Sequence, residues 1–219
     1  MARQLGGRTR QANANDRSIL QAAREVFVAD PTAPISEVAA RAGVGIAALY
    51  SRYPSKEFLL ASLCAEGQRI YIAEAEHALA RTGDGFEIFC EFLRRVVATE
   101  AHSMSGRLAG TFTPTEIHAR QAAQLKECLE VLFDRAQNSG RMRTDVTLLD
   151  VGLMIEAVAL PRFEPGARAA EIRQRLLGIT LDGFCVGGTA LPGKSLTWKE
   201  QENRWRRSTR EAPSGRTPN

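Results

Sequence analysis

The side chains between residues 34 and 56 carry hydroxyl, ammonium and guanidinium groups at a spacing that suits phosphate binding. The segment reads PISEVAARAGVGIAALYSRYPSK. Tyr50, Ser55 and Lys56 can bind phosphates, and Ser55 and Lys56 stand where a helix is expected to begin, so free backbone N–H groups there would favour an anion. Arg52 can donate two parallel hydrogen bonds to a guanine edge or hold a phosphate. Two alternatives stay open: Tyr50 as a core residue and Arg52 as a solvated surface charge.

The elements around these side chains indicate how they would be presented. Residues 34–42 have one apolar face and predict a short helix, Gly43 suits the turn that ends it, and 45–52 predict a second short helix. A helix, a glycine turn and a helix over 34–53 are typical of a helix-turn-helix motif, whose second helix lies in the major groove of DNA. The predicted DNA contacts are Arg8, Arg10, Gly45, Ile46, Ala47, Tyr50, Ser51, Arg52, Ser55 and Lys56.

Helical periodicity dominates the chain and predicts an all-α fold. Residues 14–29 carry an apolar stripe, and with the motif they predict a three-helix DNA-binding domain over 13–56. Residues 1–12 are interpreted as a flexible basic arm that either reaches the adjacent minor groove or has no contact. A helix from Lys56 to about residue 80 opens a second helical domain, over 57–188.

Two late helices are expected to be buried or to face a partner chain. Residues 147–160 are apolar almost all round, and residues 168–186 include the small Gly178 and Gly183, so the pair can form a self-complementary interface. Residues 189–219 are rich in Pro, Gly, Ser and charge and are predicted to be disordered. Trp198 and Trp205 in that tail have no explanation from the sequence.

Charge is unevenly distributed along the 219 residues. Residues 1–56 hold eight Lys/Arg against four Asp/Glu, residues 57–193 hold fourteen against eighteen, and residues 194–219 hold seven against three. A basic N-terminal unit favours a polyanionic partner. No apolar run approaches the roughly 18 residues of a membrane span, and the N-terminus lacks a secretory signal, so the cytosol is expected. The four cysteines show no metal-ligand spacing and are interpreted as small buried hydrophobes, with a redox sensor as the alternative.

The motif resembles the TetR family of transcriptional regulators. The segments ILQAAREVF and AARAGVGIAALYSRYPSKEFLL carry the resemblance over about 17–63: an aromatic-ended first helix, A-x-x-A-G-V, L-Y, an aromatic and S-K-E-x-L-L. Further along, GRMRTDVTLLDVGLMI and a last helix ending LDGF are similar only as helices. The resemblance implies an N-terminal helix-turn-helix domain fused to a helical ligand-binding and dimerisation domain, acting by default as a repressor.

Several positions depart from the family pattern. Gly45 stands where the family often has a capping Ser or Thr, which weakens the cap by only a few tenths of a kcal/mol. Ala47 and Ala48 stand where Gly and Thr are frequent, and Ala48 cannot make the phosphate contact of that Thr. Arg52 and Tyr53 also replace commoner residues. These differences bear on the operator sequence rather than on DNA binding itself.

The resemblance further implies a homodimer and an effector site. The dimer would form through about 147–160 and 168–186, with its two recognition helices about 34–36 Å apart on a palindromic operator. Helices within 56–140 would enclose a pocket for an unknown small, largely apolar effector. The polar candidates are Cys90, His118 and Gln121. The apolar lining candidates are Phe86, Phe89, Phe92, Leu93, Met104, Leu108, Phe112, Ile117 and Leu125. The alternative for each is a simple core residue. No cofactor or metal site is predicted.

Three other functions are alternatives to this one. A DNA-binding protein that is architectural or controlled by a protein partner, without an effector, is the main alternative, and a fully packed middle domain would favour it. A sensor that has lost DNA binding is supported only by Ala48. An enzyme has little support, because no GxSxG, P-loop or HExxH motif occurs and His77, His102 and His118 have no neighbouring activated nucleophile.

Overall fold

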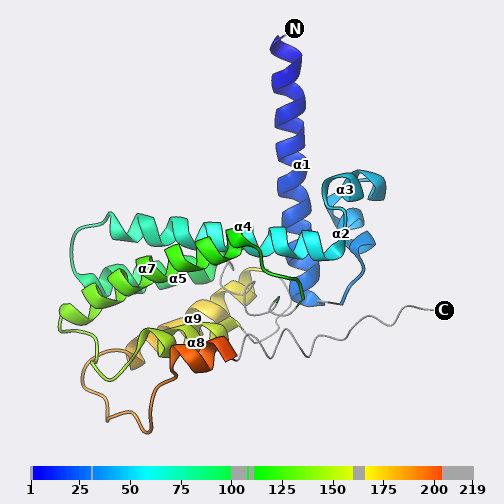
Figure 1. Ribbon diagram of the computed structural model, residues 1–219. Coiled ribbons are helices and arrows are strands. Elements are labelled where there is room, and N and C mark those ends of the chain that lie inside the picture. The colour runs from blue at the N-terminus through cyan, green and yellow to red at the C-terminus, as the bar shows by residue number, and fades with distance from the viewer. Residues whose placement is uncertain (1, 31, 100–107, 109–110, 160–165, 204–219) are drawn as a thin grey trace.

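The computed structural model describes residues 2–30, 32–99, 108, 111–159 and 166–203 (Figure 1). The all-α prediction is confirmed: among these residues the only strand-like pairing is an isolated bridge between Met142 and Cys185. The helices are α1 (Ala2–Ala29), α2 (Ile35–Ala42), α3 (Ile46–Arg52), α4 (Lys56–Leu79), α5 (Gly85–Thr99), α7 (Glu116–Asn138), α8 (Leu148–Ala159) and α9 (Ala167–Gly183).

The N-terminal unit, formed by α1–α3 and the first turns of α4, has its own apolar core. Phe27, Val38, Leu49 and Leu59 are each 0% exposed within it. α2 ends at Gly43, which adopts φ 67° and directs its N–H to the carbonyls of Ala39 and Ala40. A residue with a Cβ is strained in that left-handed conformation, so glycine sets the sharp turn between α2 and α3 as the sequence predicted.

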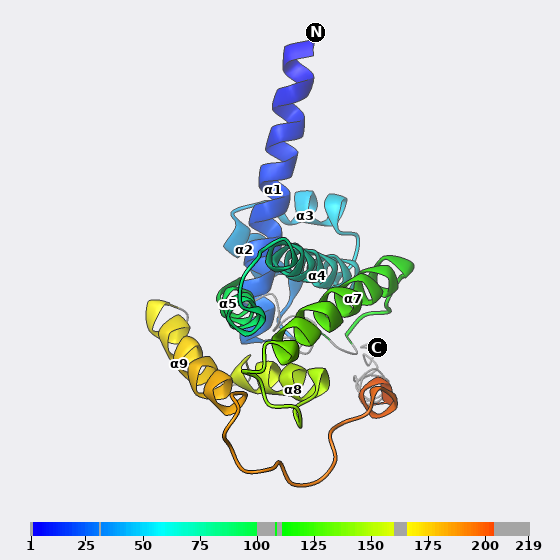
Figure 2. The same ribbon diagram turned by 90° about the vertical axis from the view of Figure 1, so that its left-hand side faces the viewer.

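The first helix is longer than the sequence analysis expected. α1 begins at Ala2, so residues 2–12, expected to form a flexible arm, continue the helix. Figures 1 and 2 show these turns projecting away from the rest of the molecule. The prediction of a flexible arm rested on the Arg, Gly and Gln content of residues 1–12, which includes Gly6 and Gly7. An established helix, however, adds one hydrogen bond per residue without a new nucleus, and the Arg, Gln and Ala residues around the glycines favour the helix.

The C-terminal unit contains a second core between α4, α5, α7, α8 and α9. Phe89, Leu132 and Leu177 are at most 1% exposed in this core. α4 supplies Leu59, Leu60 and Leu63 to the N-terminal core, and its later turns supply Ala75 and Ala78 to the C-terminal core. The two units therefore share α4, the helix in whose first turn the boundary between residues 56 and 57 was expected.

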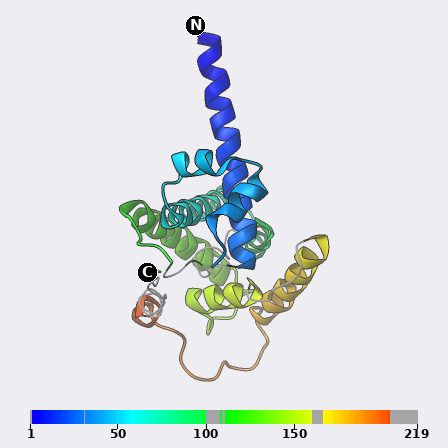
Figure 3. The ribbon, with the colours of Figure 1, turned by 90° about the vertical axis from the view of Figure 1, so that its right-hand side faces the viewer.

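Residues 189–203, named here the C-terminal strap, correct the predicted disorder of the tail. Figures 2 and 3 show the strap leading from the end of α9 past α8 toward α7. Arg143 donates to the Thr189 carbonyl, and the Leu191 N–H donates to the Asp145 carboxylate at 3.0 Å. Residues 198–203 are helical. The low apolar content of the strap suggested disorder, but the contacts that hold the strap are polar and come from residues far away in the sequence. The rest of the tail, 204–219, lies outside the described residues.

None of the described helices combines the length and the apolar character that crossing a bilayer requires.

Candidate nucleic-acid interface

α3 is buried on one side and exposed on the other. Leu49 is 0% exposed and anchors the helix in the N-terminal core, whereas Ile46 and Tyr50 are 43% and 46% exposed. Gly45, Ala47 and Ser51 are also exposed. The structure therefore brings five of the predicted contacts together on one solvent-facing side of a short helix. Tyr50 is not a core residue, which removes one alternative left open by the sequence.

Arg52, at the end of α3, is paired with Asp16 on α1. Its Nε donates to one Asp16 oxygen at 2.7 Å, and its Nη2 donates to the other. The hydrogen bond that Arg52 donates to the Asp16 carboxylate raises the pKa of Arg52. A bidentate arginine–carboxylate pair fixes the planar guanidinium, so it joins the end of α3 to α1. From the sequence, Arg52 was expected to contact a base, contact a phosphate or remain a solvated charge, and the pattern gave no sign of Asp16 as a partner.

At the start of α4, Ser55 and Lys56 make different contacts, although both were predicted to bind phosphate. Ser55 caps the helix, because its hydroxyl accepts a hydrogen bond from the Phe58 N–H at 3.1 Å. Lys56 Nζ donates to the Ala33 carbonyl at 2.6 Å and lies 5.1 Å from the centre of the Phe27 ring. Burial lowers the pKa of Lys56. Its ammonium therefore links α4 to α1 and to the loop before α2, a placement that differs from the expected exposed phosphate ligand.

Arg8 and Arg10 lie on the N-terminal turns of α1, and their side chains are outside the described residues. Their expected position on a flexible arm is corrected to a position on a helix, because α1 covers both.

The predicted effector-pocket residues are divided between the two cores. Phe86, Phe89, Cys90, Phe92 and Leu93 are buried in the C-terminal core, and Leu125 packs against it. Leu108 and Phe112 instead belong to the N-terminal core. The structure therefore does not bring the whole set together in one core. Helical periodicity identifies the buried side of a helix but not the core into which that side packs.

Three predicted pocket residues have other placements. Ile117 is 52% exposed, because it lies on the outer side of α7. Gln121 is half-buried. Met104 lies outside the described residues.

His118 joins the start of α7 to α4. Its Nδ1 accepts a hydrogen bond from the Thr115 N–H at 3.2 Å, so Nε2 carries the ring proton and donates to the Ala61 carbonyl at 2.9 Å. The Phe112 ring lies 5.1 Å from the imidazole between ring centres. Glu57, in the first turn of α4, accepts from the Thr113 N–H at 2.9 Å. This junction attaches the segment before α7 to the turns of α4 that follow the helix-turn-helix motif.

Two buried amide groups lie further along α4 and α7. Within the described residues, Gln68 Oε1 and Gln121 Oε1 are buried without a hydrogen-bond partner. Gln68 is 7% exposed on α4. Both residues lie between the His118–Ala61 contact and the hydrogen bond from Gln124 to Glu76. Gln121 was a predicted polar anchor. Gln68 was missed, although a glutamine within an otherwise apolar helix face was the signal for it.

Of the four cysteines, Cys64 and Cys90 are buried, and Cys128 and Cys185 are half-buried. Burial raises the pKa of Cys90 to about 11, and it also raises the pKa of Cys128. Because thiolates are the reactive form, these two thiols are poorly suited to redox sensing.

α8 and α9 leave large apolar side chains on the surface. Met154 on α8 is 40% exposed, Ile179 on α9 is 63% exposed, and Val186 beyond α9 is 57% exposed. Gly152 on α8 is also exposed. Large apolar side chains that are exposed on neighbouring helices are a feature of surfaces that another chain covers.

Two family models match the chain. Residues 19–63 match the model for bacterial regulatory proteins of the TetR family. Residues 84–186 match the model for the C-terminal domain of SbtR-like transcriptional regulators. The first match contains α2, α3 and the start of α4, and the second contains α5, α7, α8 and α9. A comparison with curated protein sequences finds no match.

Solved structures of bacterial regulators share the fold. The TetR regulator SCO0520 of Streptomyces coelicolor is 22% identical, with 77% of this chain and 97% of that chain covered and a TM-score of 0.56. CprB of Streptomyces coelicolor A3(2) is 17% identical, with 92% and 100% covered and a TM-score of 0.59. LfrR of Mycobacterium smegmatis, solved with proflavine, is 20% identical, with 81% and 99% covered and a TM-score of 0.52. With the exposed α3 and the two matched family models, these folds lead to one conclusion: the chain belongs to the TetR family of DNA-binding transcriptional regulators.

Proposed function

We propose that this regulator binds a palindromic operator as a homodimer and that a small, largely apolar effector releases it, so that it acts as a repressor. The single observation that carries DNA recognition is the geometry of α3. Leu49 fixes the helix in the core while Ile46, Ala47, Tyr50 and Ser51 remain exposed. A short helix braced on one side and bare on the other fits the major groove, where base edges differ between sequences.

The proposed contacts at this surface have different roles. Tyr50 and Ser51 offer hydroxyl groups to phosphates or bases, and Ile46 and Ala47 offer apolar contacts to thymine methyl groups. Ser55 remains exposed at the start of α4, where the first N–H groups of the helix favour a phosphate. Arg52 reaches DNA only if its pair with Asp16 rearranges.

Selection from a random pool of duplex DNA tests the operator proposal. The expected product is a palindrome whose half-sites are about one helical turn apart. Gel-shift titration of that sequence should then show binding that weakens steeply with salt and exceeds binding to unrelated DNA by about 10³-fold or more. A pool that shows no enrichment, or equal affinity for all sequences, would contradict the proposal.

Homodimerisation is proposed through α8 and α9. Met154 and Ile179 expose apolar surface on these helices, and a two-fold axis would allow the same patch on each chain to cover the other. Covering this surface would also hold two α3 helices at a fixed spacing, which a palindrome requires.

Effector control is proposed to act through the contact between α4 and α7. The buried amide oxygens of Gln68 and Gln121 leave two acceptors that an effector's N–H or O–H groups would satisfy. A ligand inserted there would shift α7 relative to α4, and His118 links α7 to α4 just beyond the helix-turn-helix motif. Such a ligand changes operator affinity only by the difference between its affinities for the two arrangements.

Replacing Gln68 by Leu tests this role for the amide. Removing a buried polar group that has no partner should leave the free protein as stable or more stable, by up to about 1 kcal/mol, and should abolish release by any compound that dissociates the wild-type complex. The unfolding midpoint in denaturant and the gel-shift assay measure the two effects. A clear loss of stability would show that Gln68 has a structural partner instead.

One observation favours an effector-free regulator as a second candidate. Phe89, Phe92 and Leu93, expected to line a pocket, are at most 1% exposed and tightly packed. A chemically diverse set of small molecules added to the protein–operator complex separates the two candidates. Release by at least one compound supports effector control, and unchanged binding throughout supports the effector-free regulator.

A further inference from the structure

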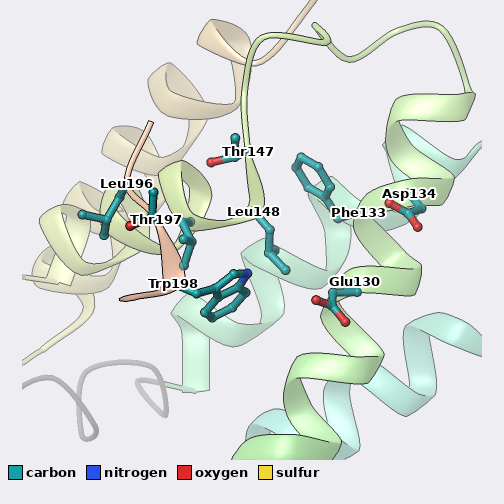
Figure 4. Close-up of a pocket in the computed structure, with 9 residues that line it drawn as sticks. Glu130, Phe133, Asp134, Thr147, Leu148, Leu196, Thr197 and Trp198 are labelled. Carbon is teal, nitrogen blue, oxygen red and sulfur yellow. The ribbon is translucent and has the colours of Figure 1, made fainter. Parts of the chain in front are cut away.

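A cavity lies where the C-terminal strap meets α7 and the start of α8 (Figure 4). Its volume is about 360 Å³. It is separate from the DNA-binding surface and from the α4–α7 contact proposed for the effector, since none of those residues lines it. The lining residues are Glu130, Phe133, Asp134, Thr147, Leu148, Leu149, Leu196, Thr197 and Trp198.

The strap is held in position by defined polar contacts. Arg143 binds the Thr189 carbonyl, and Asp145 accepts from the Leu191 N–H. The side chains of Thr197 and Glu200 cap each other's backbone N–H groups, with distances of 2.8 Å and 3.3 Å. This reciprocal cap fixes the start of the short helix at Trp198. The Trp198 ring is therefore held at the cavity by this capped helix.

The chemistry of the lining favours one class of ligand. Phe133, Leu148, Leu149, Leu196 and Trp198 provide an apolar and aromatic surface, as Figure 4 shows for the labelled side chains. Both charged residues in the lining, Glu130 and Asp134, are carboxylates one helical turn apart on α7. Aromatic faces and carboxylates both attract cations, and apolar surface attracts the body of an organic molecule.

A lysine of the protein already demonstrates this complementarity. Lys126 Nζ lies 4.9 Å from the centre of a Trp198 ring and 3.6 Å from Glu130 Oε1. The ammonium therefore occupies the position between an aromatic face and a carboxylate that a ligand cation would seek. A bound cation would compete with Lys126 for Trp198 and Glu130.

We propose that this cavity binds a small organic cation, with its charge near Glu130 and Asp134 and its apolar body against Trp198, Leu148 and Phe133. The size of the cavity is at the lower end of the range for small-molecule sites, which suits a compact ligand. A metal ion fits the cavity poorly, because its hydration shell would face mostly apolar side chains. This site goes beyond the proposed operator and effector functions and does not depend on either.

Calorimetric titration of the full-length chain without DNA tests the proposal. The probe is phenyltrimethylammonium, and its uncharged counterpart of the same shape is tert-butylbenzene. The cation should bind measurably, and at least about tenfold more tightly than the neutral compound. Equal affinity for the two compounds, or no detectable binding of the cation, would overturn the proposal.

The location is tested by the indole N–H signals in a ¹H–¹⁵N spectrum. The chain has two tryptophans, so a Trp205→Phe variant leaves Trp198 as the sole indole. The cation should shift that signal in proportion to its binding. A saturating titration that leaves the Trp198 signal unmoved would place the cation elsewhere and overturn the assignment.

Charge variants give the sharpest comparison. Glu130→Gln combined with Asp134→Asn should weaken cation binding by about tenfold, whereas Glu127→Gln, a matched change of an exposed carboxylate on α7 outside the lining, should leave it unchanged. Lys126→Met should tighten binding several-fold, because it removes the competing ammonium. Weaker binding in Lys126→Met, or equal losses in all the carboxylate variants, would contradict the proposed geometry. The denaturant midpoint of each variant, compared with that of the unchanged chain, serves as the fold control.

Discussion

At the scale of single residues, the charged side chains predicted to meet DNA are partly committed to contacts within the protein. Arg52 is held by both oxygens of Asp16, and Lys56 donates to the Ala33 carbonyl beside the Phe27 ring. Both contacts join the recognition motif to α1 or to the loop before α2. Arg52 and Lys56 therefore position α3 in this structure and are not free to bind DNA. The polar side chains that α3 leaves available for DNA are those of the exposed Tyr50 and Ser51.

Replacing Asp16 by Asn should release Arg52 toward DNA. Because the ion pair is exposed, stability should change by at most about 1 kcal/mol. Binding to unrelated DNA should tighten, and the slope of log affinity against log salt should steepen by about one unit as one more phosphate is contacted. Filter binding over a salt series measures both effects. The control is Glu37→Gln, which removes an exposed acid of α2; an equal effect from this variant would mean that only overall charge matters.

Replacing Lys56 by Met keeps the aliphatic stem and removes the ammonium. Loss of the hydrogen bond to Ala33 and of the contact with the Phe27 ring should lower the free energy of unfolding by about 1–2 kcal/mol. Denaturant titration measures this, with Lys199→Met on the exposed surface of the strap as the control. A variant of unchanged stability whose DNA binding fell uniformly across sequences would instead restore the phosphate contact first predicted for Lys56.

At the scale of elements, α4 connects recognition to the rest of the molecule. The first turns of α4 pack in the N-terminal core, and its later turns pack in the C-terminal core. The Glu57–Thr113 and His118–Ala61 hydrogen bonds attach the start of α7 to the first turns of α4. A helix is stiff along its axis, so movement of α7 would be transmitted to the motif through α4. The start of α5 lies close against the backbone near the end of α7, so that end of α7 has little room to move toward α5.

Gly85 marks that close approach. A Cβ at this position would lie 2.2 Å from the Arg135 carbonyl oxygen, which is backbone and cannot move aside cheaply. Gly85→Ala should therefore lower the free energy of unfolding by about 1–3 kcal/mol, the usual cost of overpacking. The control is Gly183→Ala, where an added Cβ meets nothing within 4 Å. Denaturant midpoints compare the two, and equal stability of both variants would contradict a tight α5–α7 contact.

At the scale of the whole molecule, the recognition helix and the exposed apolar face lie in different units. α3 belongs to the N-terminal unit, whereas Met154 and Ile179 lie on α8 and α9 of the C-terminal unit. A dimer formed through the second unit would set the distance between two copies of the first, so a change in either core would alter operator fit. In the proposed dimer, the unit that would sense an effector and the unit that would read DNA are separate but mechanically connected.

Replacing Ile179 by Glu should disrupt that dimer. A charge at the centre of an apolar interface loses its hydration when the partner binds, so the variant should be monomeric and should lose most of its operator affinity. Light scattering after size-exclusion chromatography measures the mass. Ile117→Glu is the matched control, because Ile117 is similarly exposed but lies in the first turn of α7 and not on α8 or α9. A dimer in Ile179→Glu, or a monomer in Ile117→Glu, would place the interface elsewhere.

The sequence by itself determined the helices apart from residues 2–12 and 198–203, together with the glycine turn and the family, because helical periodicity, the positive φ at Gly43 and the spacing around Tyr50 and Lys56 are local properties. Tertiary structure alone decided the Asp16–Arg52 pair, the partner of Lys56, the division of Leu108 and Phe89 between two cores, and the anchored strap. Each of these depends on contacts between residues far apart in the chain. Such contacts arise from how helices pack, and the pattern within a single helix does not specify its neighbour.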